Sequence, residues 1–173
     1  MNNNKPRNFD VTELLATLQQ RLQQLIQQQG ITDPLMIGIH TGGTWLAQQL
    51  HQQLAITAPL GMLDISFYRD DFTRIGINPE VKPSQLPESI DDRHILLIDD
   101  VLHTGRTIRA AMNELFDYGR PASIHLAVLV DRSGRELPIQ ADVSAIHLEL
   151  QPHEHIKLQG PEPLQLSLSQ GQN

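Results

Sequence analysis

An apolar strand that runs directly into a helix is the feature that most constrains the fold of this chain. The segment HILLIDDVLHTGRTIRAAM occupies residues 94–112. Strands without polar alternation are covered on both faces, as in parallel sheets that carry helices on each side. Similar apolar runs at 34–40 and 122–132 alternate with segments of helical periodicity at 10–29 and 44–54. The pattern predicts an α/β fold with a mainly parallel central sheet flanked by helices.

The length of 173 residues suits a single domain with its own hydrophobic core. We place the core of this domain at about residues 10–132. Its first helix is predicted to begin with Asp10 as the capping residue and Glu13 as its partner, and to end at Gly30. Beyond the core, the sequence changes to short alternating segments without helical periodicity. We interpret residues 133–173 as a small C-terminal β hood over one edge of the sheet.

The composition excludes several classes of protein. The chain contains no cysteine, which rules out disulfides, thiolate zinc sites and cysteine nucleophiles and fits a reducing compartment. Its apolar runs are shorter than a membrane span requires, and the polar N-terminus lacks the apolar centre of a signal peptide. We therefore expect a cytoplasmic protein without membrane contact. The net charge of −7 repels nucleic acid at long range.

The turn HTGRT is a candidate phosphate site. It leads straight into a helix, where unpaired backbone N–H groups and the helix dipole favour an anion. Two threonine hydroxyls add further donors, and the full set is Thr104, Gly105, Arg106 and Thr107. The turn lacks the complete motifs of P-loop and dinucleotide-binding proteins. An ordinary strand-to-helix turn capped by a threonine remains the alternative at this point.

Asp99 and Asp100 stand side by side at the predicted end of the strand that precedes this turn. Adjacent carboxylates repel each other, but they accept paired hydrogen bonds from a vicinal diol. They also suit a nearby Mg²⁺ bound largely through waters and substrate oxygens. The alternative is a pair of solvated turn residues. An apolar strand before the pair and a phosphate-type turn after it favour the functional interpretation.

Read together, these residues resemble a known signature. ILLIDDVLHTGRT is similar to the ribose-phosphate motif of type I phosphoribosyltransferases, which bind 5-phosphoribosyl-1-diphosphate (PRPP). Three further stretches, LDISFYRDD, GRPASIHLAVLVDRSGRELPI and GIHTGGTWLAQQL, resemble the PyrR family. Its members regulate the pyrimidine operon by transcription attenuation and have uracil phosphoribosyltransferase activity. The resemblance covers roughly residues 10–145 and is weakest in the first helix and after Asp142.

The resemblance implies a role for each matching residue. The acidic pair would hold the ribose hydroxyls, and the HTGRT turn would hold the 5-phosphate. The implied PRPP and nucleotide site comprises Thr41, Gly42, Gly43, Asp99, Asp100, Val101, Leu102, His103, Thr104, Gly105, Arg106 and Thr107. Family members often carry arginine where this chain has Gly42, so the diphosphate loop lacks a charged donor and we expect weaker PRPP binding. Arg69, in the segment that leads into a long loop, is a candidate to reach the diphosphate.

Other positions have two interpretations each. His103, as a neutral imidazole, can accept the uracil N1 proton, or it is a polar surface residue at a helix start. Asp131 and Arg132 end a predicted strand where the resemblance puts the uracil pocket. Mg²⁺ is the implied cofactor, with Asp100 and, through water, Asp131 as its candidate ligands. A strand-end turn acid is the alternative for Asp131.

The implied reaction is the transfer of phosphoribose from PRPP to uracil, which yields UMP and diphosphate. The alternative is a weakly catalytic or non-catalytic regulator that senses UMP or UTP and binds mRNA or a protein partner. Recognition of a pyr mRNA leader requires a basic face, for which the candidates are Arg120, Arg132 and Arg135. Because the net charge is −7, we hypothesise that RNA binding is weakened or lost. By resemblance we expect a homodimer or a higher homo-oligomer.

Overall fold

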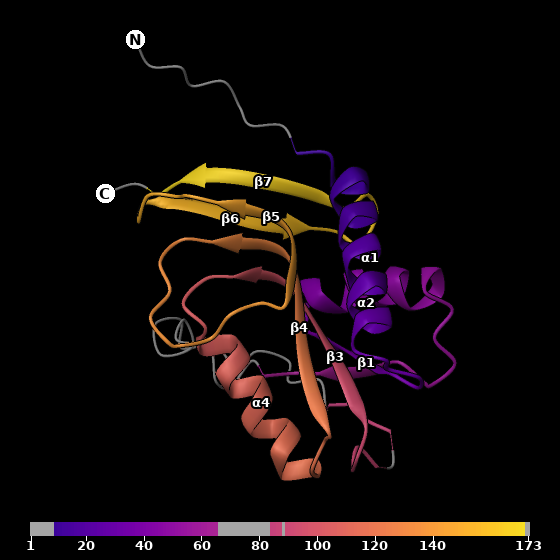
Figure 1. The fold of residues 1–173 in the computed structure, drawn as a ribbon. Coiled ribbons are helices and arrows are strands. Elements are labelled where there is room, and N and C mark those ends of the chain that lie inside the picture. Colours follow the sequence, from indigo (N-terminus) through magenta and orange to yellow (C-terminus); the bar gives the residue numbers. More distant parts are fainter. Residues whose placement is uncertain (1–8, 66–83, 88, 172–173) are drawn as a thin grey trace.

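The protein is built on one five-stranded sheet in which every strand is parallel to its neighbours (Figure 1). The computed structural model describes residues 9–65, 84–87 and 89–171. The strand order is β2-β1-β3-β4-β5. The strands are β1 (Leu35–Ile39), β2 (Gly61–Leu63), β3 (His94–Leu102), β4 (Ser123–Arg132) and β5 (Val143–Leu148). The expected parallel α/β sheet is therefore confirmed.

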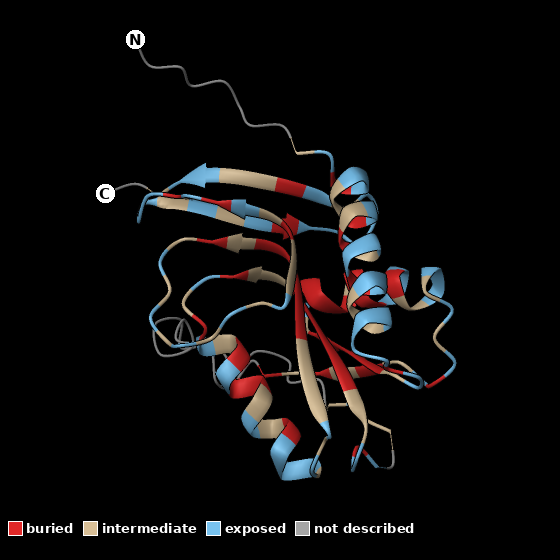
Figure 2. Ribbon diagram, viewed as in Figure 1, coloured by how far each residue is buried: buried red, intermediate tan, exposed pale blue. Residues whose placement is uncertain are grey.

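Helices cover both faces of the sheet and form two hydrophobic cores. On one face lie α1 (Val11–Gln28) and α2 (Gly42–Gln53), and on the other lies α4 (Arg106–Tyr118). The middle strands are buried along most of their length (Figure 2). This sandwiching explains why β1 and β3 have almost continuous apolar sequences, because both faces of each strand contact helices.

The first helix begins and ends as its sequence predicts. Asp10 Oδ1 accepts hydrogen bonds from the amides of Thr12 at 2.9 Å and Glu13 at 3.2 Å, which satisfies two of the donors exposed at a helix start. Gly30, just after the helix, adopts a positive φ of 62°. At the other side of the helix, the Arg21 guanidinium donates to the carbonyl oxygens of Ser144 and Ala145 in β5. These hydrogen bonds connect α1 to β5, the edge strand of the sheet.

β3 is longer than expected and contains both candidate aspartates. The sequence predicted that this strand ends at Asp100, but its pairing with β4 continues through Val101 and Leu102, which lie opposite Val130 and Asp131. The aspartates are therefore strand residues, and successive side chains of a strand point to opposite faces of the sheet. Asp99 is 2% exposed, whereas Asp100 is only partly buried.

The C-terminal β structure differs from the expected hood in its starting point. β5 pairs in parallel with β4 and extends the main sheet beyond the boundary predicted at residue 132. Of the described strands, β6 (Glu154–Gln159) and β7 (Gln165–Gln170) form a separate antiparallel sheet. Leu158 and Leu166 anchor this hairpin in the core on the α1 and α2 side. The hairpin lies across the carboxyl ends of the central strands (Figure 1).

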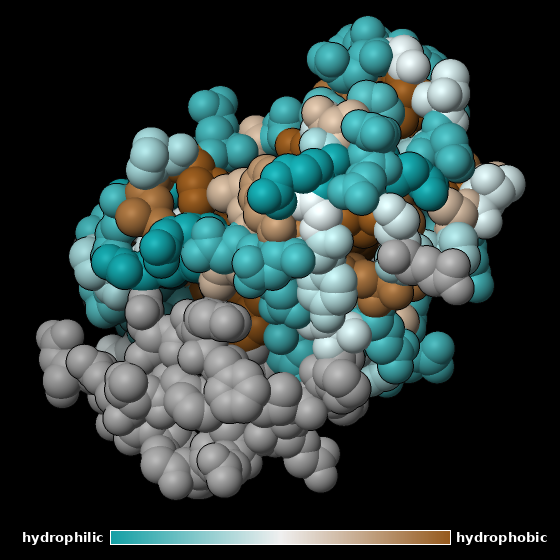
Figure 3. Space-filling model, turned by 90° about the horizontal axis from the view of Figure 1, so that it is seen from below, coloured by the Kyte–Doolittle hydropathy of each residue, from teal (hydrophilic) through white to brown (hydrophobic). Residues whose placement is uncertain are grey.

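No helix in the described ranges is long and apolar enough to cross a membrane. Hydrophilic residues predominate among the coloured atoms on the face shown in Figure 3, and smaller hydrophobic areas lie between them.

Candidate functional site

A cavity of about 460 Å³ lies where β3 passes into α4, beneath the C-terminal hairpin. In open α/β sheets, ligands bind beyond the carboxyl ends of the strands, and this cavity occupies that position. Its lining is Asp99, Asp100, Val101, Leu102, His103, Thr104, Gly105, Arg106, Thr107, Ile108, Arg132, His155 and Ile156. The continuous run from β3 into α4 thus lines the same cavity, as the sequence motif predicted.

The turn between β3 and α4 has the geometry of an anion site. Gly105 precedes the helix with φ of 95°, a left-handed conformation that favours glycine. The Thr104 hydroxyl accepts from the amide of Arg106 at 3.2 Å, and the first intrahelical amide bond runs from Arg109 to the Gly105 carbonyl at 3.0 Å. Apart from the amide of Arg106, the amides ahead of that bond are the donors that a helix start leaves for a ligand.

The two aspartates are held in the same way but differ in exposure. Asp99 Oδ1 accepts from the amide of Asp100 at 2.9 Å, and Asp100 Oδ1 accepts from the amide of Val101 at 2.9 Å. Each carboxylate is thereby fixed by the next residue in the chain. Because Asp99 is 2% exposed and Asp100 is only partly buried, Asp100 is the carboxylate more accessible to a ligand.

The expected diphosphate loop, residues 41–43, packs against the end of β3 that contains Asp100. Gly42 and Gly43 begin α2, and both are buried, whereas Thr41 is exposed. A β-carbon on Gly42 would lie 2.4 Å from Asp100 Oδ2, and one on Gly43 would lie 2.4 Å from the carbonyl oxygen of Ile98. None of the three residues lines the cavity itself. The structure therefore brings Gly42 and Gly43 against β3, where they support the acidic pair.

Arg132 lies in the cavity wall and is 4% exposed. Its guanidinium donates to the carbonyl oxygens of Glu154 at 2.8 Å, Ser133 at 3.3 Å and Gln151 at 3.4 Å. Burial lowers the pKa of this arginine. No carboxylate of the described residues forms an ion pair with it, but the nearby negative charge of Glu154 partly offsets the lowering of its pKa. Arg132 thus joins the hairpin to the cavity.

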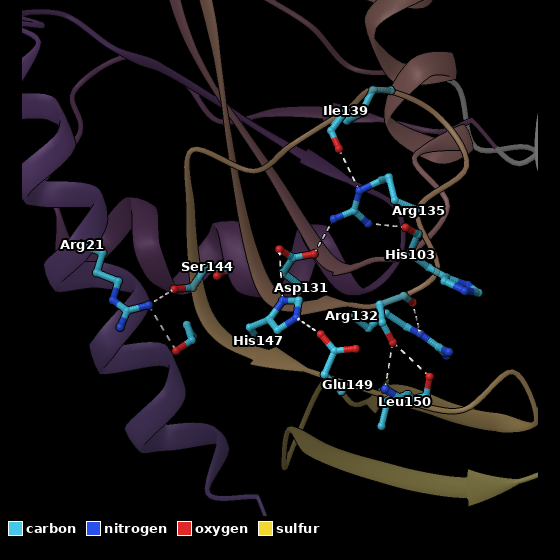
Figure 4. A network of polar contacts seen from close by, with 12 residues as sticks. Arg21, His103, Asp131, Arg132, Arg135, Ile139, Ser144, His147, Glu149 and Leu150 are labelled. Atoms are coloured by element: carbon cyan, nitrogen blue, oxygen red, sulfur yellow. Dashed lines mark hydrogen bonds and ion pairs between the residues drawn. The ribbon is translucent and has the colours of Figure 1, made fainter.

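Asp131 does not line the cavity but belongs to a polar network beside it (Figure 4). Its Oδ1 lies 2.5 Å from Arg135 Nη2, and its Oδ2 lies 3.5 Å from His147 Nδ1. His147 in turn contacts Glu149 at 2.8 Å. The hydrogen bond with Glu149, followed by the contacts with Asp131, raises the pKa of His147. Its ion pair with Arg135 makes Asp131 a poorer candidate for a metal ligand than the sequence indicated.

His103 lies at the rim of the cavity with an exposed side chain. Its ring is close to Gly134, where a β-carbon would lie 2.8 Å from Nε2. Partial burial lowers the pKa of His103, and the positive charges of Arg132 and Arg135 lower it further. The neutral imidazole is therefore favoured, which is the form that can accept a proton.

The three arginines that were predicted to contact RNA do not form one basic face. Arg120 lies between α4 and β4, at the end of the sheet opposite the cavity, and its amide donates to Asp91 Oδ1 at 2.6 Å. Arg132 is buried, and the Arg135 guanidinium is occupied by Asp131 and by two carbonyl oxygens. Arg69 lies outside the described residues.

Three cavity residues were not foreseen from the sequence, and one of them, Ile108, simply continues the predicted run into α4. His155 and Ile156 come from β6 and close the cavity from the hairpin side. The alternation in EHIKLQ indicated a strand but not its position over the β3–α4 turn. The separation of about fifty residues along the chain explains why local patterns could not reveal this contact.

A parallel sheet with an acidic pair at the end of β3 and an amide-lined turn into α4 defines the class of a phosphoribosyltransferase. The family model of the phosphoribosyl transferase domain matches residues 10–159. The chain is 58% identical to the bifunctional protein PyrR of Nitrosococcus oceani over 97% of this chain and 96% of that protein. It is 55% identical to the bifunctional protein PyrR of Pseudomonas fluorescens, over 90% of this chain and 93% of that protein. The chain belongs to the PyrR family of phosphoribosyltransferases.

Solved structures agree with this fold. The hypoxanthine phosphoribosyltransferase of Trypanosoma cruzi superposes with a TM-score of 0.66 at 17% identity, over 98% of each chain. A purine phosphoribosyltransferase from Pyrococcus horikoshii superposes with a TM-score of 0.60 at 22% identity, over 80% of this chain and 82% of that chain. At these identities the likeness concerns the fold alone, and it confirms the predicted type I phosphoribosyltransferase architecture.

Proposed function

We propose that this protein is a uracil phosphoribosyltransferase, which transfers the phosphoribosyl group of PRPP to uracil and releases UMP and diphosphate. The observation that carries the proposal is the cavity of about 460 Å³, which the acidic pair and the amide-lined turn share. A sugar diol and a phosphate are held by these two kinds of group respectively. Membership in the PyrR family supports the same activity.

The charges around the cavity suit this reaction. Departure of diphosphate from ribose C1 builds positive charge on the sugar, and a carboxylate such as that of Asp100 stabilises a developing cation. A neutral His103 can accept the N1 proton of uracil. Arg132 provides a buried positive charge in the wall of the cavity, which favours an anionic ligand.

Mg²⁺ is the proposed cofactor, and one accessible carboxylate fits it. The described residues contain no group of three side chains that could hold a metal ion by themselves. This agrees with an ion bound through substrate oxygens, waters and one carboxylate, for which Asp100 is the candidate. When bound, Mg²⁺ would neutralise charge on the diphosphate leaving group.

The test is UMP formation from uracil and PRPP with Mg²⁺, in wild type and in Asp100→Asn. We expect activity in wild type and a loss of at least tenfold in Asp100→Asn, because a hydrogen bond to a charged group contributes about 1.5–3 kcal/mol. Asp117→Asn, an exposed position on α4 outside the cavity lining, is the matched control and should keep wild-type activity. Wild-type protein that binds UMP but forms none would contradict the proposal and support a sensor.

A regulatory role is the second candidate function. PyrR relatives are named bifunctional, and the family regulates pyrimidine genes through an mRNA leader. We propose that RNA binding is weakened here, because Arg132 is buried, Arg120 lies at the opposite end of the sheet, and Arg135 is paired with Asp131. A gel-shift titration against a pyr leader with UMP present should show weak binding without sequence selectivity. Tight, selective and salt-dependent binding would contradict this part of the proposal.

A further inference from the structure

The segment of residues 133–139 packs against the turn of residues 103–107, which lines the cavity. The amides of Glu136 and Leu137 both donate to the carbonyl oxygen of Thr104, each at 3.0 Å. The Arg135 guanidinium donates to the carbonyl oxygen of His103. Two successive carbonyl groups of the turn are thereby held on the side away from the ligand.

The same segment packs closely on the turn. A β-carbon on Gly105 would lie 3.3 Å from Ile139 Cβ and 3.4 Å from Leu137 Cβ. In addition, Arg106 Nε and Glu136 Oε2 form an ion pair at 2.9 Å. The contact between the turn and this segment is therefore continuous.

The carbonyl contacts determine where the amides of the turn point. In a trans peptide, the carbonyl group of one residue and the N–H of the next point in opposite directions. With the His103 and Thr104 carbonyls bound to the 133–139 segment, the N–H groups of Thr104 and Gly105 must face the other way. Both residues line the cavity, and within the described ranges neither amide donates to another protein group.

We propose that Arg135 is the positioning residue of the phosphate site, since it holds the turn of residues 103–107 so that its amides face the 5-phosphate. This inference rests on the proposed function. Arg135 is itself held by Asp131 at 2.5 Å and by the Ile139 carbonyl at 2.8 Å. A cation bound to a carbonyl oxygen also polarises the peptide and strengthens its N–H as a donor.

The contacts of Arg135 distinguish this role from direct phosphate binding. Each of its three guanidinium nitrogens already donates to a protein oxygen (Figure 4). Its positive charge is balanced by Asp131, and its side chain does not line the cavity. Arg135 thus acts through the peptide groups of the turn, and two of its five N–H groups, one on each Nη, remain for the RNA contact that the sequence predicted.

The test compares two ligands that differ only in the phosphate. The affinities of UMP and uridine are measured by calorimetry for wild type, Arg135→Gln, Arg135→Lys and the control Arg120→Gln. We expect Arg135→Gln to weaken UMP binding about tenfold, as loss of a charged hydrogen bond does, and to leave uridine binding unchanged. Arg135→Lys, which keeps the charge, should lose less. Arg120→Gln should alter neither affinity.

Several outcomes would overturn the inference. Unchanged UMP affinity in Arg135→Gln would show that the turn does not need this residue. An equal loss for UMP and uridine would show a general structural role. If Arg135→Gln fails to fold, as judged by circular dichroism, the same comparison in Arg135→Lys decides between these results. Wild type that binds neither ligand would contradict the proposed function itself, and the inference with it.

Discussion

Gly42 packs directly against the side chain of Asp100: a β-carbon at residue 42 would lie 2.4 Å from Oδ2 and 2.6 Å from Cγ of that aspartate. The start of α2 therefore limits the positions that the accessible carboxylate can take. The sequence indicated only that Gly42 removes a charged donor from the diphosphate loop. The contact shows in addition that a side chain here would have to displace Asp100.

Gly42→Ala should therefore lower activity without unfolding the protein. The added methyl group displaces the Asp100 carboxylate from the ribose, and the loss of a charged hydrogen bond predicts a decrease in kcat/KM of roughly 10- to 100-fold. Steady-state UMP formation measures this. The control is Gln48→Ala, an exposed change in the same helix. Equal activity in the two variants would show that the carboxylate position is not critical.

Arg132→Gln should affect both stability and nucleotide binding. The change leaves the carbonyls of Glu154 and Gln151 without their buried donor, a cost of about 1–3 kcal/mol in the free energy of unfolding. Because Arg132 joins the hairpin to the cavity wall, affinity for UMP should fall as well. Denaturant unfolding and calorimetry measure the two effects.

Arg120→Gln is the matched control for this experiment, because Arg120 is exposed at the opposite end of the sheet. It should change stability by less than about 1 kcal/mol and leave UMP affinity unchanged. If Arg132→Gln behaved in the same way, the buried guanidinium would not be the link between hairpin and cavity.

Local sequence patterns predicted the parts of the fold that depend on local physics. The apolar sequence of β3 identified a strand covered on both faces, and the Asp10 cap located the start of α1. β5 was misassigned to the hood because its pattern alternates: the strand lies at the sheet edge, and only some of its residues are buried. An alternating segment does not by itself reveal whether it will pair in parallel or antiparallel fashion.

Of the candidate site, too, local sequence predicted only the part that is contiguous in the chain. The run from Asp99 to Thr107 lines one cavity because it is contiguous in the chain. The roles of Arg132 and Arg135 could not be predicted, since their partners are largely backbone carbonyls. Such partners carry no side-chain signature. His155 and Ile156 reach the cavity only through the packing of the hairpin.

His103 should titrate below the ordinary histidine value of 6.5, because burial and the nearby arginines lower its pKa. The imidazole then stays neutral to lower pH and remains able to accept a proton. We expect kcat to fall on the acid side of that pKa in wild type and this limb to disappear in His103→Asn. NMR titration gives the pKa directly. An unchanged acid limb in His103→Asn would exclude His103 as the proton acceptor.

His147 should show the opposite shift, because its hydrogen bond with Glu149 and its contacts with Asp131 raise its pKa above 6.5. A raised folded-state pKa contributes stability that is fully present below about pH 6.5 and is lost as the pH rises through the folded-state value. The free-energy difference between wild type and His147→Gln should therefore be larger at about pH 5.5 than at about pH 8.5. The side chain is 53% exposed, which limits the effect to about 1 kcal/mol. A difference that does not vary with pH would contradict the assignment.

The most direct measurement is a crystal structure of the protein with UMP bound. We expect the phosphate against the amides of the turn between Thr104 and Thr107, and the ribose diol within hydrogen-bond distance of Asp100. A nucleotide bound outside the cavity at the end of β3, or one whose ribose contacts neither aspartate, would contradict this expectation.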